Sequence, residues 1–481
     1  MFASDLVSER RWAEGLNQEQ AAAVHHDGGP LLVVAGAGSG KTRTLVARVA
    51  RLIDSGVPAE RILLLTFTRR ASAEMLRRVD HLVNRSTSGR VWGGTFHGIS
   101  HRLLRRFSPA VGLAEGFTIL DQADSEVLFG MLRAERGLGE KGIRFPKKET
   151  IAAIYSRVVN QQAKLDEIVS KHFPWCVDHQ DPMRQLFRDY TARKREHNTI
   201  DYDDLLLYWR ALMESPAAEA VKGLFDHVLV DEYQDTNRIQ ADILAGMCEA
   251  AHPTVVGDDA QAIYGFRAAE VENMWEFESR FAGTRRLTLD QNYRSTPQVL
   301  AVANAVMAEA ESGYPKNLWS VRQDGPMPSL VTCHDEPTQA EYVCEQVLAL
   351  RELGIPLRDQ AVLFRTSHHS AGLEVELGRR NIPFVKFGGL KFLEAAHIKD
   401  LTSMLRIASN PDDELAWNRV LQLIPGIGPA TAQRLLQRAV AKAEVDGTGV
   451  VEAFCELDIP VPAEAAPILA ELQAALRDVT A

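Results

Sequence analysis

A chain of 481 residues is too long for one hydrophobic core, and three or four domains are the expected number. Its composition of 46% hydrophobic, 25% charged and 7% aromatic residues is ordinary for a globular protein, and no uncharged apolar run is long enough to predict a membrane span. The net charge of −10 argues against a general nucleic-acid binder, because phosphate contacts need Lys and Arg, although clusters of basic residues would allow a local positive groove.

Neither the N-terminus nor the cysteines indicate export. The first residues carry charges of both signs and no apolar core, so they do not form a signal peptide. The five cysteines are scattered, odd in number and never spaced as a CxxC pair, which predicts reduced and mostly buried thiols. We therefore expect a cytoplasmic protein with no membrane partner.

The first predicted elements enclose a glycine-rich loop. A helix begins near Leu16–Gln20, a buried strand follows at 31–34, and a helix continues from Lys41 and Thr42. The loop between them consists of Ala35, Gly36, Ala37, Gly38, Ser39 and Gly40. Glycine lets backbone N–H groups approach an anion, and the helix start adds its positive dipole end. The stretch predicts a nucleotide-phosphate cradle in which Lys41 reaches the β- and γ-phosphates and Thr42 binds Mg²⁺, although Ala35 replaces the usual glycine.

Gln20 and Phe67 each allow two interpretations. The amide of Gln20 both donates and accepts hydrogen bonds and so could read adenine, or it could be a polar residue at a helix start. Phe67 follows a second buried strand, 61–66, and precedes a basic helix. An exposed Phe in this position suits base stacking, whereas a core Phe is the simpler interpretation of the stretch alone. The segment 92–97 repeats the order of strand, Thr, aromatic residue and His.

A helical stretch from about residue 103 to 198 separates these strands from a pair of carboxylates. Its periodicity predicts a helical insertion, after which another helix starts at 201–206 with acids in its first turn. A buried strand at 227–230 then ends in Asp231 and Glu232. Asp231 would hold Mg²⁺, and Glu232 would orient or deprotonate the attacking water. An acidic loop after a strand is the alternative.

A further strand and turn, 254–261, places another polar residue beside aromatic ones. Gln261 could sense the γ-phosphate, and Tyr264, Phe266 and Arg267 follow at once. This order would couple a nucleotide sensor to groups that can stack on bases.

A second α/β unit is predicted to begin near Arg286, with a turn at 292–295. Strands are expected at 360–366 and 382–387, and a loop at 388–394 leads into helices. The Gly/Pro turn at 424–429 could hold a DNA phosphate, but a plain helix–helix connection is the simpler interpretation.

Eight motifs in order now carry a resemblance that covers the chain from about residue 16 to 435. They are LNQEQ, AGAGSGKTR, TFTRRASAEM, GTFHG, DYDDLL, LVDEYQDT, VGDDAQAIYGFRA and LDQNYRS. The chain resembles the UvrD/Rep/PcrA family of superfamily 1 helicases, which use ATP to move 3′ to 5′ on single-stranded DNA. The resemblance implies an α/β fold of two RecA-like P-loop domains with parallel sheets, each carrying an inserted, mainly helical subdomain.

The implied domains have definite boundaries. The first RecA-like domain would comprise 1–104 and 200–284, with its helical insertion at 105–199. An incomplete second RecA-like domain would occupy 285–395, and a second insertion would begin at 396–481.

The resemblance also assigns roles to residues. Gln20 would read the adenine, Arg43 and Tyr293 would enclose it, and Arg294 would reach the γ-phosphate as an arginine finger. Gln261 would link the state of the nucleotide to DNA. The implied DNA track comprises Phe67, Thr68, His97, Tyr264, Phe266 and Arg267, with Phe266 where the family commonly has Trp. ATP and Mg²⁺ would be the cofactors, and single-stranded DNA and 3′-tailed duplex the partners; no protein partner is indicated.

One departure from the family pattern concerns its later motifs. A second DNA-contacting segment and a second arginine finger are not found before Ala481, which indicates a shortened chain or a natural short relative. We expect such a chain to bind ATP, hydrolyse it slowly and unwind no duplex. The alternatives are the motor subunit of a helicase–nuclease and a non-catalytic, ATP-switched DNA-binding module.

Overall fold

The chain divides into two compact units, Met1–Pro328 and Ser329–Ala481, in the computed structural model. The structure describes residues 11–83, 90–138, 144–249, 251–387, 396–409, 411, 414–457, 461–462 and 465–480. In these residues no helix is both long and apolar enough to cross a membrane. All five cysteines are free thiols, and Cys176, Cys344 and Cys455 are buried.

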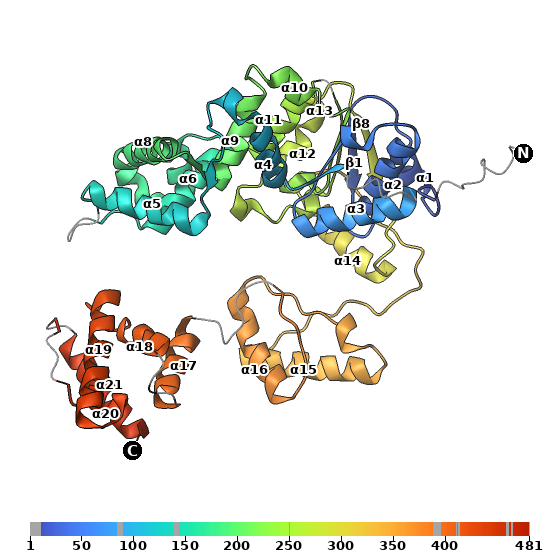
Figure 1. Ribbon diagram of the computed structural model, residues 1–481. Coiled ribbons are helices and arrows are strands. Elements are labelled where there is room, and N and C mark those ends of the chain that lie inside the picture. The colour runs from blue at the N-terminus through green and yellow to red at the C-terminus, as the bar shows by residue number, and fades with distance from the viewer. Residues whose placement is uncertain are drawn as a thin grey trace, which may run out of the picture. The chain divides into compact units, whose positions relative to one another are not determined.

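The first unit is built on a six-stranded parallel sheet, with β1 (Leu31–Ala35) between β7 and β8 (Figure 1). The strand order is β3-β2-β6-β7-β1-β8. The other strands are β2 (Ile62–Leu65), β3 (Trp92–Gly94), β6 (His227–Val230), β7 (His252–Gly257) and β8 (Arg285–Leu289). Because all the strands are parallel, their carboxyl ends meet at one edge, where ligands of such sheets bind.

Helices cover both faces of this sheet, and each face has its own core. Side chains alternate along a strand, so Leu32 and Val34 enter one core while Leu31 and Val33 enter the other. The core of Leu31 and Val33 is closed by α1 (Gln18–Val24), α2 (Lys41–Asp54) and α3 (Arg69–Val83). The opposite core is closed by α4 (Phe96–Phe107), α9 (Tyr202–Leu212), α10 (Ala218–Lys222), α11 (Arg238–Met247), α12 (Glu272–Trp275) and α13 (Phe277–Arg280).

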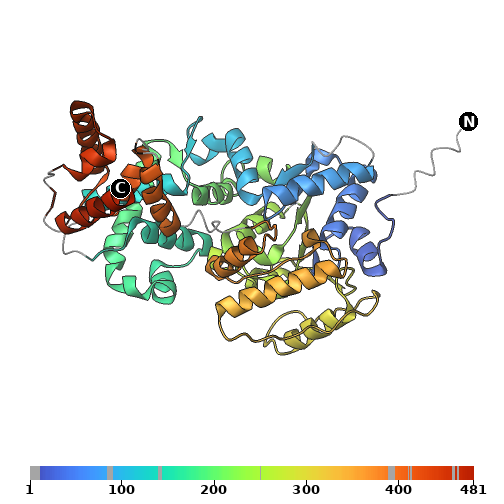
Figure 2. The ribbon, with the colours of Figure 1, turned by 90° about the horizontal axis from the view of Figure 1, so that it is seen from below.

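In its described residues the predicted helical insertion contains four α-helices around a separate hydrophobic core, and it lies to one side of the sheet in both ribbon views (Figure 2). The helices are α5 (Gln122–Glu135), α6 (Lys148–Gln161), α7 (Leu165–His172) and α8 (Gln180–Glu196). The strands β4 (Thr118–Ile119) and β5 (Thr199–Ile200) pair where the chain enters and leaves this insertion. Lys194 of α8 is buried against Asp201 and Asp204, whose carboxylates lie 2.6 and 2.5 Å from its Nζ. This ion group ties the insertion to α9.

Side-chain caps explain several helix starts that the sequence predicts. Asp201 Oδ1 accepts a hydrogen bond from Asp204 N at 2.8 Å, so the acidic start of α9 is confirmed. Thr95 caps α4 in the same way, accepting from Gly98 N at 3.2 Å.

The strand predicted near Arg286 forms, but it does not begin a second sheet. It is β8, which pairs with β1 from Leu31↔Arg285 to Ala35↔Leu289. The assignment to a separate α/β unit was therefore wrong, because an apolar run predicts a strand without naming its partner. After β8 the first unit continues through α14 (Pro297–Ala308).

The second unit is helical in its described residues, which contain no β-strand. The strands predicted at 360–366 and 382–387 are wrong for this structure: neither segment forms a strand or pairs with one among the described residues, and Leu363 and Phe387 are 93% and 88% exposed. Apolar side chains favour a strand only where a neighbouring strand accepts its hydrogen bonds. The helices are α15 (Glu336–Glu352), α16 (Ala371–Arg379), α17 (Ala396–Ser409), α18 (Glu414–Leu421), α19 (Pro429–Asp446), α20 (Val450–Cys455) and α21 (Ala466–Thr480).

Two loop predictions also fall in this unit. The turn at 424–429 connects α18 to α19, in agreement with the simpler of its two interpretations. The loop predicted at 388–394 lies outside the described residues.

Candidate functional site

The glycine-rich loop lies between β1 and α2 and depends on glycine at two positions. Gly38 and Gly40 have φ of +73° and +88°, which L side chains rarely adopt. A Cβ on Gly40 would also lie 2.6 Å from Gln20 Nε2, and one on Gly38 would lie 2.8 Å from the Cβ of Arg294. The loop is therefore closely surrounded by residues that the sequence predicts for the same site.

Gln20 supports this loop from the start of α1. Its Oε1 accepts from Asn17 N at 3.1 Å, while its Nε2 donates to Ser39 O at 2.8 Å. The interpretation of Gln20 as a helix-start residue is thus confirmed, and a contact with adenine stays a prediction.

Lys41 and Glu232 form an ion pair across the loop, with Nζ 2.8 Å from Oε2. Lys41 is buried at the N-terminus of α2, and Glu232 follows β6. Glu232 has φ of +51°, a left-handed conformation that is uncommon outside glycine and often marks a functional site. The backbone thus holds the Glu232 carboxylate toward the lysine of the phosphate loop.

Asp231 presents a buried oxygen that fits a divalent cation. Its Oδ1 is buried and has no hydrogen-bond partner. Burial, together with the charge of Glu232, raises the pKa of Asp231 to about 7. A buried carboxylate oxygen without a partner is costly, and Mg²⁺ takes oxygen ligands of this kind. Asp231, with Thr42 at the start of α2, therefore has the chemistry to hold Mg²⁺.

A hydrogen-bond chain connects the carboxylates to Gln261. Gln234 donates from Nε2 to Glu232 Oε2 at 3.0 Å and accepts at Oε1 from Asp258 N at 2.9 Å. Gln261 in turn donates to Asp258 Oδ2 at 2.5 Å. The buried Lys316 forms ion pairs with both Asp258 and Asp259. These hydrogen bonds connect Glu232, the predicted water-activating residue, with Gln261, the predicted sensor of the γ-phosphate.

The sequence analysis missed several members of this polar site, including Asp258 and Asp259. Gln234 and Asp235 stand within the DEYQD motif, and burial and Glu232 raise the pKa of Asp235 to about 7. That local motif could have identified them. Lys316 is far from the motif along the chain, and no local signal indicated it.

The turn after β8 packs directly on the phosphate loop. Asn292 donates from Nδ2 to Ala37 O at 2.5 Å, and Tyr293 N donates to Gly38 O at 2.9 Å. The Oδ1 of Asn292 accepts from Arg294 N at 2.8 Å, which fixes the turn. Asn292 was not predicted as a site residue, although it lies in the NYRS motif.

The structure brings Tyr293 and Arg294 to the loop, but it shows a different bond for Arg43. Arg43 donates from Nη2 to the carbonyl of Glu14 at 2.5 Å. The hydroxyl of Tyr293 donates to Gln291 Oε1 at 3.0 Å. A stacking of Arg43 and Tyr293 about adenine stays a prediction.

Three aromatic rings form a short ladder at the same edge of the sheet. The ring centroids of Phe67 and Tyr264 lie 4.6 Å apart, and those of Tyr264 and Phe266 5.8 Å apart. The guanidinium of Arg267 lies 5.6 Å from the rings of both Tyr264 and Phe266. Phe266 is 65% exposed and Phe67 is half-buried outside the sheet cores, so the interpretation of Phe67 as a core residue was wrong. Exposed rings beside an arginine can stack on nucleobases.

His97 lies against Tyr202 rather than in this ladder. Their rings meet edge to face with centroids 6.2 Å apart, and burial lowers the pKa of His97 to about 4. The imidazole is therefore neutral near pH 7. Thr68 uses its hydroxyl to accept from Ala71 N at 3.1 Å, at the start of α3.

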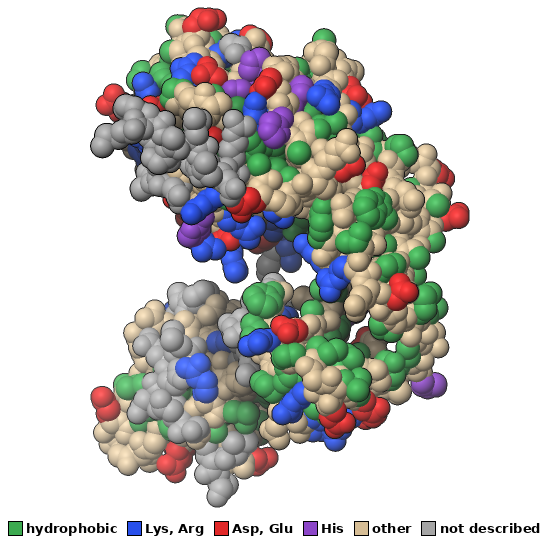
Figure 3. Space-filling model, turned by 90° about the vertical axis from the view of Figure 1, so that its right-hand side faces the viewer, with side chains coloured by type: hydrophobic (Ala, Val, Ile, Leu, Met, Phe, Trp, Pro, Cys, Tyr) green, Lys and Arg blue, Asp and Glu red, His purple; other side chains and the backbone are tan. Residues whose placement is uncertain are grey.

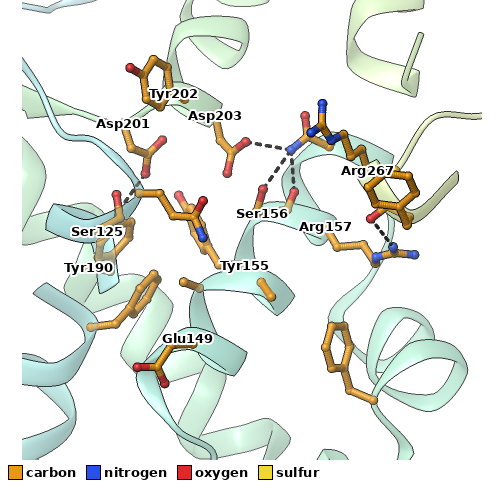
Figure 4. A pocket seen from close by; sticks show the side chains of 18 residues that line it. Ser125, Glu149, Tyr155, Ser156, Arg157, Tyr190, Asp201, Tyr202, Asp203 and Arg267 are labelled. Carbon is orange, nitrogen blue, oxygen red and sulfur yellow. Dashed lines mark hydrogen bonds between the residues drawn. The ribbon is translucent and has the colours of Figure 1, made fainter. Parts of the chain in front are cut away.

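A cavity of about 430 Å³ lies between the insertion and the end of the ladder (Figure 4). Its lining includes Tyr202, Phe266 and Arg267, together with Tyr155 and Arg157 of α6. Tyr202 is a candidate that the sequence analysis missed, although it stands in the DYDDLL motif. The cavity places aromatic and basic side chains beyond Phe266.

Basic clusters elsewhere give little sign of an extended positive surface. Glu74 pairs with both Arg77 and Arg78 at 2.8 Å. Acidic and basic side chains are interspersed on the face drawn in Figure 3. This agrees with the net charge of −10 and leaves the aromatic ladder as the better candidate for a nucleic-acid contact.

The parallel sheet, the glycine loop with Lys41 and Thr42, and the carboxylates after β6 define a P-loop nucleotide-binding protein. The UvrD/REP helicase N-terminal domain matches residues 16–282, and the UvrD-like helicase C-terminal domain matches residues 287–446. The chain belongs to the UvrD/Rep helicase family.

Curated relatives support this membership. The chain is similar to the ATP-dependent DNA helicase PcrA of Staphylococcus epidermidis, with 33% identity over 451 residues, covering 91% of this chain and 61% of the relative. It is 34% identical to that of Leuconostoc citreum over 441 residues, covering 90% and 58%. It is 32% identical to that of Staphylococcus aureus over 431 residues, covering 88% and 58%. The chain thus spans about three-fifths of the length of these relatives.

Proposed function

We propose that the chain is an ATP-driven DNA motor, which hydrolyses ATP in response to single-stranded DNA. The observation that carries the proposal is the hydrogen-bond chain Glu232–Gln234–Asp258–Gln261. It begins at the Lys41 ion pair and ends three residues before Tyr264 of the aromatic ladder. A nucleotide that changes the partner of Lys41 would thereby alter a network that reaches the ladder.

The proposed hydrolysis uses a change of partner by Lys41. On ATP binding the ammonium leaves Glu232 for the β- and γ-phosphates, because the phosphates carry more negative charge. Glu232 is then free to accept a hydrogen bond from the attacking water and to take up its proton. Arg294, held beside Gly38 by Asn292, supplies positive charge near the γ-phosphate.

Thr42 and Asp231 would hold Mg²⁺ in this mechanism. When held there, the ion would offset negative charge on the phosphates of ATP. The unpartnered Oδ1 of Asp231 supports this assignment. Gln20, Arg43 and Tyr293 remain the proposed adenine contacts.

The proposed nucleic-acid ligand is single-stranded DNA, bound by stacking on Phe67, Tyr264 and Phe266. The edges and faces of bases are free in a single strand, whereas a blunt duplex keeps them paired and stacked. On the basis of the resemblance to the family, we further propose 3′-to-5′ movement, a 3′-tailed duplex as substrate and a role in DNA repair or replication. The free thiols are compatible with the cytoplasmic location that we propose.

We also propose that the domains follow the family, with the boundaries expected from the resemblance and one change. The first RecA-like domain extends to Leu289, because β8 belongs to its sheet.

Equilibrium binding tests the proposal. A fluorescent single-stranded oligonucleotide should bind residues 1–481 more tightly than a blunt duplex of equal length, and a fluorescent ATP analogue should bind the wild type but bind Lys41→Ala weakly. Tighter binding of the blunt duplex, or nucleotide binding that ignores Lys41, would refute it.

A non-catalytic, ATP-switched DNA-binding module is a second candidate. The observation that favours it is that 360–366 and 382–387 pair with no strand among the described residues of the second unit. If the chain is such a module, ATP binding changes its affinity for DNA, ATP hydrolysis is slow and no duplex is unwound. The rate of ATP hydrolysis with and without single-stranded DNA decides, since hydrolysis that DNA stimulates would eliminate the module.

A further inference from the structure

Helix α6 of the insertion is bonded to the loop that carries the aromatic ladder. Arg157, labelled in Figure 4, donates from Nη2 to the carbonyl of Phe266 at 3.1 Å. Arg157 also donates from the same Nη2 to the carbonyl of Gly265 at 3.4 Å. Its Nη1 lies 3.1 Å from the ring nitrogens of His172. The guanidinium therefore bridges the insertion and the backbone between Tyr264 and Arg267, which we call the stacking loop.

The same helix is bonded to the loop that follows the carboxylates. Asn160 accepts at Oδ1 from Asn237 Nδ2 at 2.7 Å, and its own Nδ2 donates to Asp203 Oδ1 at 2.7 Å. Asn237 also caps α11, accepting from Gln240 N at 3.0 Å. Both amides are thus held in one orientation by buried partners. Because Arg157 and Asn160 are three residues apart, they lie on one face of α6.

The segment just after the stacking loop is also bonded to the loop that follows the carboxylates. Glu270, just after the stacking loop, donates from its backbone N to Thr236 O at 2.9 Å. The buried Asn273 donates from Nδ2 to the same carbonyl at 2.9 Å. Helix α6 therefore contacts both the stacking loop and the loop that follows the carboxylates, and the chain just after the stacking loop contacts the latter loop as well.

We propose that α6 positions the stacking loop and that Arg157 is the positioning residue. Two carbonyls on consecutive residues, held by one guanidinium, fix the direction in which Phe266 points. Phe266 is largely exposed and would otherwise have few contacts to hold its ring in line with Tyr264. Arg157 thus affects DNA binding by holding the stacking loop, and it does not itself contact a phosphate of the DNA. The inference rests on the proposed function, since it needs the ladder to bind single strands.

The test compares Arg157→Ala and Arg157→Lys with the wild-type chain and with Arg184→Ala as a matched control. Arg184 is an insertion arginine whose 2.6 Å ion pair is with the neighbouring Asp181 on its own helix. The measurements are affinity for an oligonucleotide carrying 2-aminopurine, its quenching at saturation, the dependence of affinity on salt, and thermal unfolding.

We expect Arg157→Ala to bind about tenfold more weakly, which corresponds to losing part of the stacking of one base. Quenching at saturation should fall, because fewer bases lie against a ring. Arg157→Lys should restore part of the affinity and part of the quenching, since an ammonium can still donate to one of the carbonyls. The salt dependence should keep its wild-type slope, whereas loss of a direct phosphate contact would lower the slope by about one. Arg184→Ala should match the wild type throughout.

Each contrary result has a separate meaning. A wild-type chain that binds no single strand overturns the proposed function and this inference together. Wild-type binding with an unaltered Arg157→Ala variant, or a lower salt slope in that variant, overturns the inference alone. If Arg157→Ala unfolds, Arg157→Lys decides, because wild-type affinity and quenching in a lysine variant would show that the bridge to both carbonyls is not needed.

Discussion

The ammonium of Lys41 lies 2.8 Å from a carboxylate oxygen of Glu232, so the phosphate-loop lysine and the proposed water-activating residue neutralise each other. Lys41 is almost buried, while about a third of the Glu232 side chain is exposed. A buried ammonium needs a counter-charge, and the phosphates of ATP can supply a stronger one. In the mechanism that we propose, this ion pair is a latch that nucleotide binding opens.

Lys41→Ala tests the phosphate side of this latch. We expect the variant to fold and to lose ATP turnover, because the positive charge on the β- and γ-phosphates is gone. Steady-state hydrolysis is the measurement, with Lys222→Ala as control, since Lys222 pairs at 2.6 Å with the largely exposed Glu249. Unchanged hydrolysis in Lys41→Ala would remove the loop from the mechanism.

Glu232→Gln tests the proposed role of the Glu232 carboxylate in activating water. The amide keeps the size of the side chain but cannot take up a proton, so Mg²⁺·ATP binding should survive while turnover falls by roughly 10² to 10⁴. Nucleotide binding and single-turnover hydrolysis separate the two steps. If binding disappears with turnover, Glu232 serves the metal ion and the assigned roles are wrong.

Asp203 gives a pH dependence of stability. Burial, together with the charge of Asp201, raises the pKa of Asp203 to about 7. The native state then keeps a proton that the unfolded chain has released above pH about 4. The raised pKa makes the native state lose stability as pH rises from about 4 to about 7.

Asp203→Asn measures this contribution. The amide oxygen can still accept from Asn160, but it carries no charge at any pH. We expect the melting temperature of the variant, relative to wild type, to increase between pH 5 and pH 8. A difference that stays constant over this range would contradict a buried, titrating Asp203.

Phe266→Ala should weaken binding to single strands by about 1–3 kcal/mol, the cost of one stacked base. Phe67→Ala should act in the same direction, and neither effect should depend much on sequence, because every base offers a face. Titrations with oligonucleotides of different composition check this. Val177→Ala, an exposed apolar residue of the insertion, is the control. A loss confined to one base type would point to edge recognition instead.

Local patterns predicted the parts of the site that lie within single motifs. The glycines of the loop, Lys41 and the carboxylates after β6 each follow a buried strand, and parallel strands bring their carboxyl ends to one edge. The links between motifs could not be predicted in this way. Lys316 reaches Asp258 across 58 positions and Asn160 reaches Asn237 across 77, and no periodicity encodes such contacts.

The errors in the fold have the same origin. β8 was expected to start a second sheet, and its hydrogen bonds to β1 depend on tertiary packing. The segments at 360–366 and 382–387 have strand-like composition, yet composition does not provide the neighbouring strand that a ladder requires.

We propose that ATP hydrolysis is coupled to single-stranded DNA through Gln261. The most direct measurement is the rate of ATP hydrolysis with and without a single-stranded oligonucleotide, for the wild type and for Gln261→Ala. We predict that DNA stimulates the wild type, even if its rate is low, and that the variant keeps its nucleotide and DNA affinities but loses the stimulation. A wild-type rate that DNA leaves unchanged, or full stimulation in Gln261→Ala, would contradict the account.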